Sequence, residues 1–192
     1  TVSREAGDNV KKYAVIPAGA ENQGNYHVAY VNGTFEITPA SLKLEAEGYN
    51  AAYDGAEHTA TITTELPEGT TVEYKVGDGE WTTEVPSVKD VDSIEVEIRA
   101  TNANYTIEGT KVTLTVIQKE VTVTGNNGSK VYGEKDPELT AKVEGNLNND
   151  EIVYTVSREA GDNVKKYAVI PAGAENQGNY HVTYVNGTFE ND

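Results

Sequence analysis

The sequence predicts an all-β protein whose small modules, β-sandwich-like or β-grasp-like, are arranged end to end, with one or two short helical turns at most. Three observations predict this class. Short runs of alternating apolar and polar residues fill the chain, Gly-containing turn sequences separate the runs, and a 36-residue segment occurs twice. Val and Thr dominate the runs, as is typical of β-branched residues on pleated strands.

The repeat is nearly perfect. Residues 1–36 recur as residues 155–190, and the only difference is Ala29 against Thr183. Such near-identity indicates a recent duplication, and we expect the parent protein to contain further copies. Because a segment of this size seldom folds alone, we expect residues 1–36 to borrow strands from a neighbouring module or from another chain, or otherwise to remain loose.

The positions of the two copies define the expected modules. The second copy follows residues 119–154, which have no counterpart before Thr1. We therefore expect the chain to be an internal part of a longer protein and to contain three parts. These are the C-terminal half of a repeat at 1–38, a module of another kind at 39–118, and a complete repeat at 119–192.

Individual strands are predicted from the alternation. Ile94, Val96 and Ile98 alternate with charged residues, so one face of this strand is buried and the other is wet. Similar patterns occupy residues 111–117 and 119–125, where alternate Val and Leu side chains lie on one face.

Turns and a helical turn are predicted from Gly, Asn and Pro. Gly77-Asp78-Gly79 predicts a hairpin between two strands, and Asn186-Gly187 predicts a tight turn, as does Asn32-Gly33. The best candidate for a helical turn is Asp136-Pro137-Glu138-Leu139, because Asp caps helices and Pro favours their first position.

The composition excludes several classes of function. The 192 residues carry a formal net charge of −16, which argues against nucleic acid or an anionic membrane as the main partner. Cys and Met are absent, which excludes disulfides, thiol catalysis and Cys-ligated zinc. No apolar run approaches the roughly 20 residues that span a bilayer, so we expect no membrane insertion.

Several motifs follow one another in a recognisable order in the C-terminal part. They are Tyr132-Gly133, Asp136-Pro137-Glu138-Leu139-Thr140, Arg158 to Val164, Tyr167-Ala168-Val169, Asn179-Tyr180 and Asn186-Gly187-Thr188-Phe189. With these motifs, residues 119–190 resemble the MBG-type repeat (Tyr-Gly form) of bacterial surface proteins, and residues 1–37 resemble its second half. Residues 39–118 are similar to companion Ig-like repeats of surface adhesins through Tyr53-Asp54-Gly55 and Asn104-Tyr105.

The resemblance implies a structural stalk or spacer in a secreted, cell-wall-associated bacterial surface protein that projects a distal adhesive region. The alternative is an adhesin module that itself binds host glycan or protein. The implied location is extracellular, at the cell surface or cell wall. We expect no enzymatic activity, no catalytic, cofactor-binding or metal-binding residues, and no cofactor. The expected partners are neighbouring repeats of the chain, and strand-swapped self-association through residues 1–38 is a further expectation.

Polar candidates for ligand binding have simpler structural explanations. His27, His58 and His181 lack the spacing of metal ligands, and we expect them on polar strand faces. Acidic turns offer oxygens for weak calcium binding, but none has the EF-hand spacing and turn geometry explains them better. These turns are Asp78-Gly79-Glu80, Asp90-Val91-Asp92 and Asn146 to Glu151.

Three further possibilities concern other residue types. The family resemblance implies that such stalk modules sometimes carry a Lys–Asn amide cross-link, for which Lys119 or Lys43 with Asn186 are the candidates, although a turn explains Asn186 better. Exposed Tyr residues and Trp81 would allow stacking on sugars, although we expect Trp81 to anchor the core of the middle module. The Asn-x-Ser/Thr sequences indicate turns and not glycosylation, and they begin at Asn32, Asn104, Asn127 and Asn186.

Overall fold

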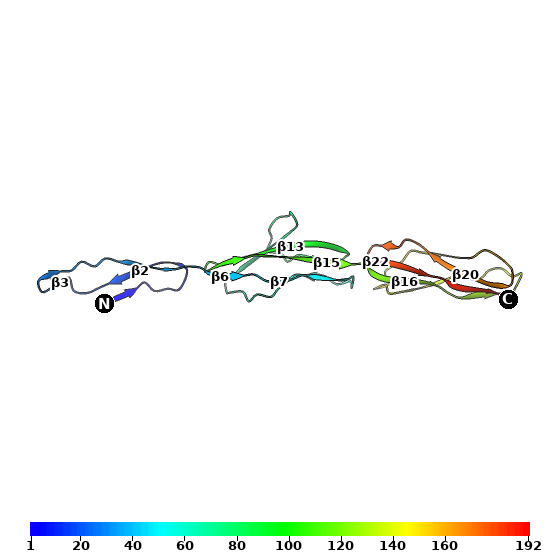
Figure 1. Ribbon diagram of the computed structural model, residues 1–192, viewed down its shortest axis with the longest axis horizontal. Helices are drawn as coiled ribbons and strands as arrows, with labels where there is room; N and C mark the ends of the chain where they lie inside the picture. The colour runs from blue at the N-terminus through cyan, green and yellow to red at the C-terminus, as the bar shows by residue number, and fades with distance from the viewer. The chain divides into compact units, whose positions relative to one another are not determined.

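The computed structural model of the protein describes residues 1–192, and it contains strands, turns and loops but no helix (Figure 1). The all-β prediction is therefore confirmed. Residues 136–139 form no regular structure, so the predicted helical turn is absent. The Asp136 carboxylate binds Arg158 and Lys130, which lie on two different strands, instead of capping a turn. No helix is present that is long and apolar enough to cross a membrane.

The chain divides into two compact units. Unit 1 contains Thr1–Glu47, Thr61–Val85 and Val96–Val112, and unit 2 contains Gly48–Ala60, Pro86–Glu95 and Thr113–Asp192. The two long strands β13 (Asp92–Thr101) and β15 (Thr110–Ile117) contribute residues to both units. The module boundaries expected after residues 38 and 118 stay predictions.

The N-terminal part of unit 1 is a three-stranded sheet with a small hairpin. Its strands are β1 (Val2–Arg4), β2 (Lys11–Pro17), β3 (Asn22–Gln23), β4 (Tyr26–His27) and β5 (Gly33–Ile37). The sheet has the order β1-β2-β5 with antiparallel pairing, and β3 and β4 form the hairpin. These strands pair with no others, so the expected borrowing of strands from a neighbouring module does not occur in this chain.

The rest of unit 1 contains five further strands. They are β6 (Ala40–Lys43), β7 (Ala46–Glu47), β10 (Thr61–Ile62), β11 (Thr71–Val76) and β14 (Tyr105–Glu108). β6 pairs in parallel with β14, although the two are far apart in sequence. β7 pairs antiparallel with β10, and β11 pairs antiparallel with β13. Alternation in β13 buries Val96 and Ile98, as predicted.

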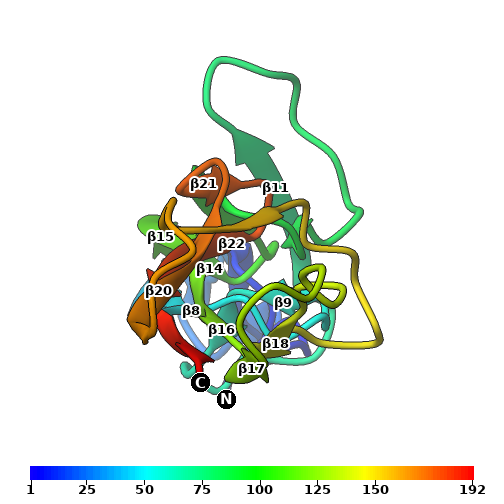
Figure 2. The ribbon, with the colours of Figure 1, turned by 90° about the vertical axis from the view of Figure 1, so that its right-hand side faces the viewer.

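The loop after β11 stands away from the sheet in both views of the ribbon (Figures 1 and 2). The predicted turn forms, because the Gly79 N–H donates to the Val76 carbonyl at 2.9 Å. The second arm is not a strand, however, and it shares only the bridge between Tyr74 and Thr82 with β11. β13 is the regular partner of β11 because its buried apolar side chains offer more packing than the polar second arm.

The first part of unit 2 contains β8 (Tyr49–Ala52), β9 (His58–Thr59) and β12 (Ser87–Val88). β8 pairs in parallel with β15, and β12 pairs antiparallel with β9. The hydrogen-bonded order of the larger sheet is β11-β13-β15-β8.

The C-terminal part of unit 2 consists of two four-stranded sheets. Their strands are β16 (Lys119–Gly125), β17 (Gly128–Lys130), β18 (Ala141–Glu144), β19 (Thr155–Arg158), β20 (Lys165–Ala172), β21 (Asn176–Gln177), β22 (Tyr180–Val185) and β23 (Gly187–Asn191). The orders are β18-β16-β22-β21 and β17-β23-β20-β19. Two pairs are parallel, β16 with β22 and β17 with β23. Val123, Val169, Val182 and Phe189 supply buried side chains from both sheets.

The connection at Asn186-Gly187 carries the chain from one sheet to the other. β22 ends at Val185 in the first sheet, and β23 begins at Gly187 in the second. The turn is therefore a corner between sheets and not a hairpin. Gly187 is required because a Cβ atom there would lie 2.1 Å from the carbonyl oxygen of Gly125.

The two copies of the repeated sequence form the same three-stranded arrangement but differ in burial. We call residues 1–36 copy 1 and residues 155–190 copy 2. Strands β1-β2-β5 of copy 1 correspond to β19-β20-β23 of copy 2. Only copy 2 receives the parallel strands β16 and β17. As a result, Tyr180 is 4% exposed, whereas its counterpart Tyr26 is 77% exposed.

Candidate functional site

Arg158 organises a cluster of charges in unit 2. Its guanidinium donates through Nε and Nη2 to the Asp136 carboxylate at 2.5 and 3.1 Å. It also lies 5.2 Å from the ring centroids of both Tyr167 and Phe189. Lys130 completes the cluster, with Nζ 2.8 Å from Asp136. The cluster therefore ties β17, β19 and the segment at Asp136 together beside the aromatic core.

The protonation behaviour of this cluster is that of a structural ion pair. The hydrogen bond from Arg158, and then that from Lys130, holds the pKa of Asp136 at about 2, below its ordinary value of 3.8. The bonds to Asp136 likewise raise the pKa of Arg158 and that of Lys130. Groups held so firmly in their charged forms are poor proton donors and acceptors near neutral pH. The arrangement stabilises the repeat and offers no acid–base pair.

Copy 1 contains the same arginine without this carboxylate partner. Arg4 lies 5.2 Å from the Tyr13 ring and 5.0 Å from the Phe35 ring, as Arg158 does in copy 2. Its only carboxylate contact among the ion pairs is with Asp8 at 3.4 Å. The two copies therefore provide a matched comparison of one arginine with and without the cluster.

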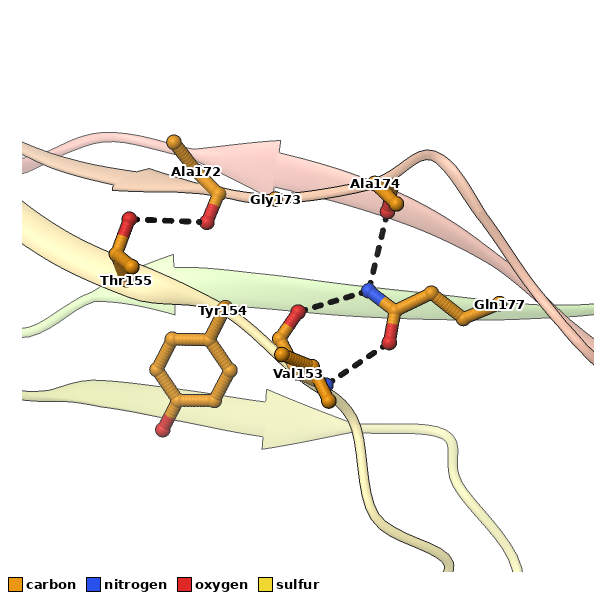
Figure 3. Close-up of a pocket in the computed structure, with 7 residues that line it drawn as sticks. All are labelled: Val153, Tyr154, Thr155, Ala172, Gly173, Ala174 and Gln177. Carbon is orange, nitrogen blue, oxygen red and sulfur yellow. Dashed lines mark hydrogen bonds between the residues drawn. The ribbon is translucent and has the colours of Figure 1, made fainter.

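A cleft of about 590 Å³ lies beside the end of β20 (Figure 3). Its lining consists of Val153, Tyr154, Thr155, Ala172, Gly173, Ala174 and Gln177. The Gln177 amide donates to the carbonyl oxygens of Val153 and Ala174 at 2.8 and 3.1 Å, and it accepts from the Val153 N–H at 2.8 Å. The amide thus holds two chain segments together, and its polar atoms are engaged within the protein.

Each of the three histidines lies beside a carboxylate. His27 lies 2.8 Å from Glu21, and His58 lies 2.8 Å from Asp54 while stacking on Tyr49 with centroids 3.8 Å apart. His181 contacts two carboxylates, Glu120 at 2.8 Å and Glu175 at 2.7 Å. These hydrogen bonds raise the pKa of His181, with Glu120 as the larger cause.

The structure does not gather the acidic turns into an ion site. No group of three or more His, Asp or Glu side chains is arranged to hold a metal ion. Asp90 accepts from the side-chain amide of Asn179 at 3.0 Å, and Asp150 accepts from the Tyr180 hydroxyl at 2.5 Å. These carboxylates therefore have structural partners of their own.

Trp81 lies in the loop after β11 and is not a core anchor, contrary to the sequence-based expectation. It is half-buried, and its ring is covered by the Arg99 guanidinium at 4.0 Å and by Lys75 Nζ at 5.3 Å. Because the loop leaves the sheet, the indole packs on the charged outer face of β11 and β13. Cation–π contact stabilises this position.

The structure does not bring Lys119 and Asn186 together. Lys119 pairs with Tyr180 at the start of β22, whereas Asn186 follows the end of that strand. A separation of six residues along a strand corresponds to about 20 Å. Two of the Asn-x-Ser/Thr asparagines have structural contacts, since Asn127 Oδ1 accepts from the Thr188 N–H and Asn104 Oδ1 accepts from the Val10 N–H, both at 2.8 Å.

The contact made by Asn104 recurs elsewhere in the chain, and sequence analysis missed it. In unit 1, the Asn104 amide accepts from the Val10 N–H at 2.8 Å and donates to Asn9 Oδ1 at 3.2 Å. In unit 2, the Asn179 amide accepts from the Val91 N–H at 2.8 Å and donates to Asp90 Oδ1 at 3.0 Å. The signal in the sequence is the Asn-Tyr pair that both kinds of repeat contain.

A ring contact accompanies the Asn179 contact. The Tyr180 ring meets the Tyr53 ring edge-on, with centroids 5.7 Å apart. Tyr53 and Tyr180 are 7% and 4% exposed. Each buried edge-to-face pair of this kind adds about 0.5–1.5 kcal/mol beyond area burial. Two polar contacts and one aromatic contact thus join the segment before residue 118 to the repeat that follows it.

Comparison with known families identifies the C-terminal part of the chain. Residues 121–190 match the family model of the MBG domain (YGX type). No curated protein matches the chain. The matched segment contains most of both parallel strand pairs, the Arg158 cluster and the residues Asn179 and Tyr180. Residues 121–190 are therefore similar to the MBG domain of the YGX type, a structural repeat module typical of bacterial surface proteins.

Proposed function

We propose that this chain is a spacer segment of a secreted bacterial surface protein, in which repeated β modules hold a distal adhesive region away from the cell wall. One observation carries the proposal, which is that a single module plan occurs twice. β6 with β14 and β8 with β15 are parallel pairs in residues 39–118. β16 with β22 and β17 with β23 are parallel pairs in residues 119–192.

The chemistry of the surface supports a spacer. The Gln177 amide in the cleft and the charged groups of the Arg158 cluster are engaged in bonds that hold chain segments together. A net charge of −16 makes neighbouring chains repel one another and keeps a dense surface array soluble. In a chain of such modules, length is set by the number of copies.

Self-association through residues 1–38 is a minor part of this proposal. Copy 1 and copy 2 have nearly the same sequence, so either would accept β16 and β17. Moving these strands from copy 2 of one chain to copy 1 of another leaves the number of paired strands unchanged. Because association also costs translational entropy, we expect such dimers to be weak.

Surface display tests the proposal. Residues 37–190 form one full period of 154 residues, as the spacing from Thr1 to Thr155 shows. Zero, one, two and four periods are placed between a cell-wall anchor and a distal epitope, and the height of the epitope above the wall is measured by super-resolution microscopy. A spacer predicts a height that increases in equal steps with each period.

The adhesin alternative makes the opposite prediction. If the repeats themselves bind host glycan or protein, cells that display the periods without any distal domain adhere, and adhesion increases with copy number. Adhesion of this kind together with a constant epitope height would contradict the spacer.

A further inference from the structure

Three loops in the chain have the form that receives the asparagine contact. Each loop is an Asn or Asp followed by Val, at Asn9-Val10, Asp90-Val91 and Asn163-Val164. Asn104 occupies the first loop and Asn179 occupies the second. The third has no such partner, although copy 1 and copy 2 have identical sequences around it.

The third loop is already in the shape of the first. The Tyr13 hydroxyl donates to the Asn9 carbonyl at 2.6 Å, and the Tyr167 hydroxyl donates to the Asn163 carbonyl at 2.9 Å. The arginine of each copy donates to the glycine carbonyl of its loop, at 2.8 Å for Gly7 and 2.7 Å for Gly161. A loop held by its own module loses little conformational entropy when a partner docks.

The exposed surface of the third loop matches what a partner would cover. Val164 is 65% exposed, whereas Val91 in the occupied second loop is 38% exposed. Asn191 holds the loop in place, because its side-chain amide donates to the carbonyl oxygens of Asp162 at 2.7 Å and Asn163 at 3.3 Å.

A tyrosine next to the loop completes the likeness to the occupied site. The Tyr53 N–H donates to the carbonyl of Ile117 in β15, and the Tyr132 N–H donates to the carbonyl of Asp192 after β23, both at 2.8 Å. The two tyrosines thus hold the same place in their modules. Tyr53 is covered by the ring of Tyr180, but Tyr132 is 64% exposed. A hollow of about 280 Å³ is lined by both Tyr132 and Asp162, so ring and loop lie at one end of the domain.

We propose that Asn163, Val164 and Tyr132 form a docking surface for a further module of the kind formed by residues 39–118. The occupant is identified by its counterpart, because the identical loop of copy 1 receives Asn104 from this kind of module. The incoming Asn accepts from the Val164 N–H and donates to the Asn163 side chain, and its neighbouring Tyr covers Tyr132. The Asn-Tyr pair of the incoming module differs from the loop that receives it, so the contact is head-to-tail. The same contact can therefore recur between every pair of successive modules.

This inference deepens the proposed function, on which it rests for the presence of further modules. An extended chain tests it, with residues 39–118 appended directly after Asp192. Two residues, Asn191 and Asp192, follow copy 2, just as Ile37 and Thr38 follow copy 1 before residue 39. The linker in the extended chain therefore has the length found after copy 1. Hydrogen exchange of single amides is followed by NMR in the extended chain and in the 192-residue chain.

We expect exchange of the Val164 amide to slow at least about fivefold in the extended chain, the effect of one added hydrogen bond. The Val10 and Val91 amides serve as references for occupied loops, because both are bonded in either chain. Asn104→Ala in the appended copy alone should return Val164 to its original rate. Asn50→Ala in that copy, at an exposed position of β8, should leave the slowed rate unchanged.

Protected β13 amides in the appended copy show that the appended module is folded, and protected Val10 and Val91 amides show that the occupied loops are intact. If the exchange rate of the Val164 amide is unchanged under these conditions, the docking surface is overturned. Slow exchange that persists in the Asn104→Ala variant would also overturn it, because the protection would then come from another contact. The outcome is separate from the display test. Epitope height can increase with copy number while Val164 stays unprotected, and Val164 can be protected in repeats that prove to be adhesive.

Discussion

Phe35 and Phe189 occupy the same position in the two copies of one sequence, yet Phe35 is 44% exposed and Phe189 is fully buried. Each is paired with the tyrosine of its own sheet, Tyr13 or Tyr167. Only Phe189 also has β17 beside it, where Gly128 lies against its ring. Burial of the phenylalanine therefore depends on strands that lie outside the repeated sequence.

Truncation of the two phenylalanines should have unequal effects. We expect Phe189→Ala to lower the free energy of unfolding of the MBG domain by about 3–5 kcal/mol, because it leaves a cavity in a closed core. Phe35→Ala should cost about 1 kcal/mol, because much of that ring already contacts water. Hydrogen exchange of the β20 amides measures the loss of stability around Phe189, and exchange of the β2 amides measures the loss around Phe35. Equal costs would show that copy 1 has a closed core of its own.

Alanine at the corner glycine should also distinguish the copies. A Cβ atom at Gly187 would lie 2.1 Å from the Gly125 carbonyl oxygen, whereas at Gly33 the nearest neighbour is Val15 Cβ at 3.6 Å. We expect Gly187→Ala to destabilise the domain by at least about 2 kcal/mol through backbone displacement. Gly33→Ala should be neutral or slightly stabilising, because it reduces the entropy of the unfolded chain. Urea unfolding followed by circular dichroism compares the variants, and equal midpoints would contradict the close approach.

Acid should weaken the MBG domain through Asp136. The pKa of Asp136 in the folded protein is about 2, below its ordinary value of 3.8. Its contribution to stability is therefore complete above about pH 5 and is lost as the pH falls toward 2. Asp136→Asn should lower the melting temperature at pH 7. Between pH 5 and pH 2 the melting temperature of this variant should fall less than that of the unmodified protein. Arg4→Gln in copy 1 is the matched control for Arg158→Gln, and only the latter should remove this acid dependence.

His181 should titrate above its ordinary pKa of 6.5, since Glu120 and Glu175 both bind its ring. A raised pKa in the folded protein means that the stabilisation is complete below about pH 6 and is lost as the pH rises through the raised value. NMR titration of the imidazole protons measures the pKa directly. Glu120→Gln should lower the pKa of His181, and a value at or below 6.5 in the unmodified protein would contradict the two contacts.

Much of the strand pattern was predictable because alternation is a local property. The regular runs at 93–101, 111–117 and 119–125 became β13, β15 and β16, with the expected faces buried. The predictions that depended on partners were less successful. Gly77-Asp78-Gly79 made a turn without a two-stranded hairpin, and Trp81 packed on cations outside the core. Local sequence does not say which distant strand offers the better apolar neighbour.

The sequence by itself determined that this protein is all-β, acidic and repetitive, and its motifs were enough to indicate the MBG repeat. These properties follow from residue type, period and identity between copies, which need no knowledge of long-range contacts. Only the tertiary structure decided that one copy is closed by β16 and β17 while the other is open, and that Asn104 and Asn179 make equivalent contacts. The physical reason is that β pairing and side-chain docking join residues distant in sequence, so identical segments take different environments when their partners differ.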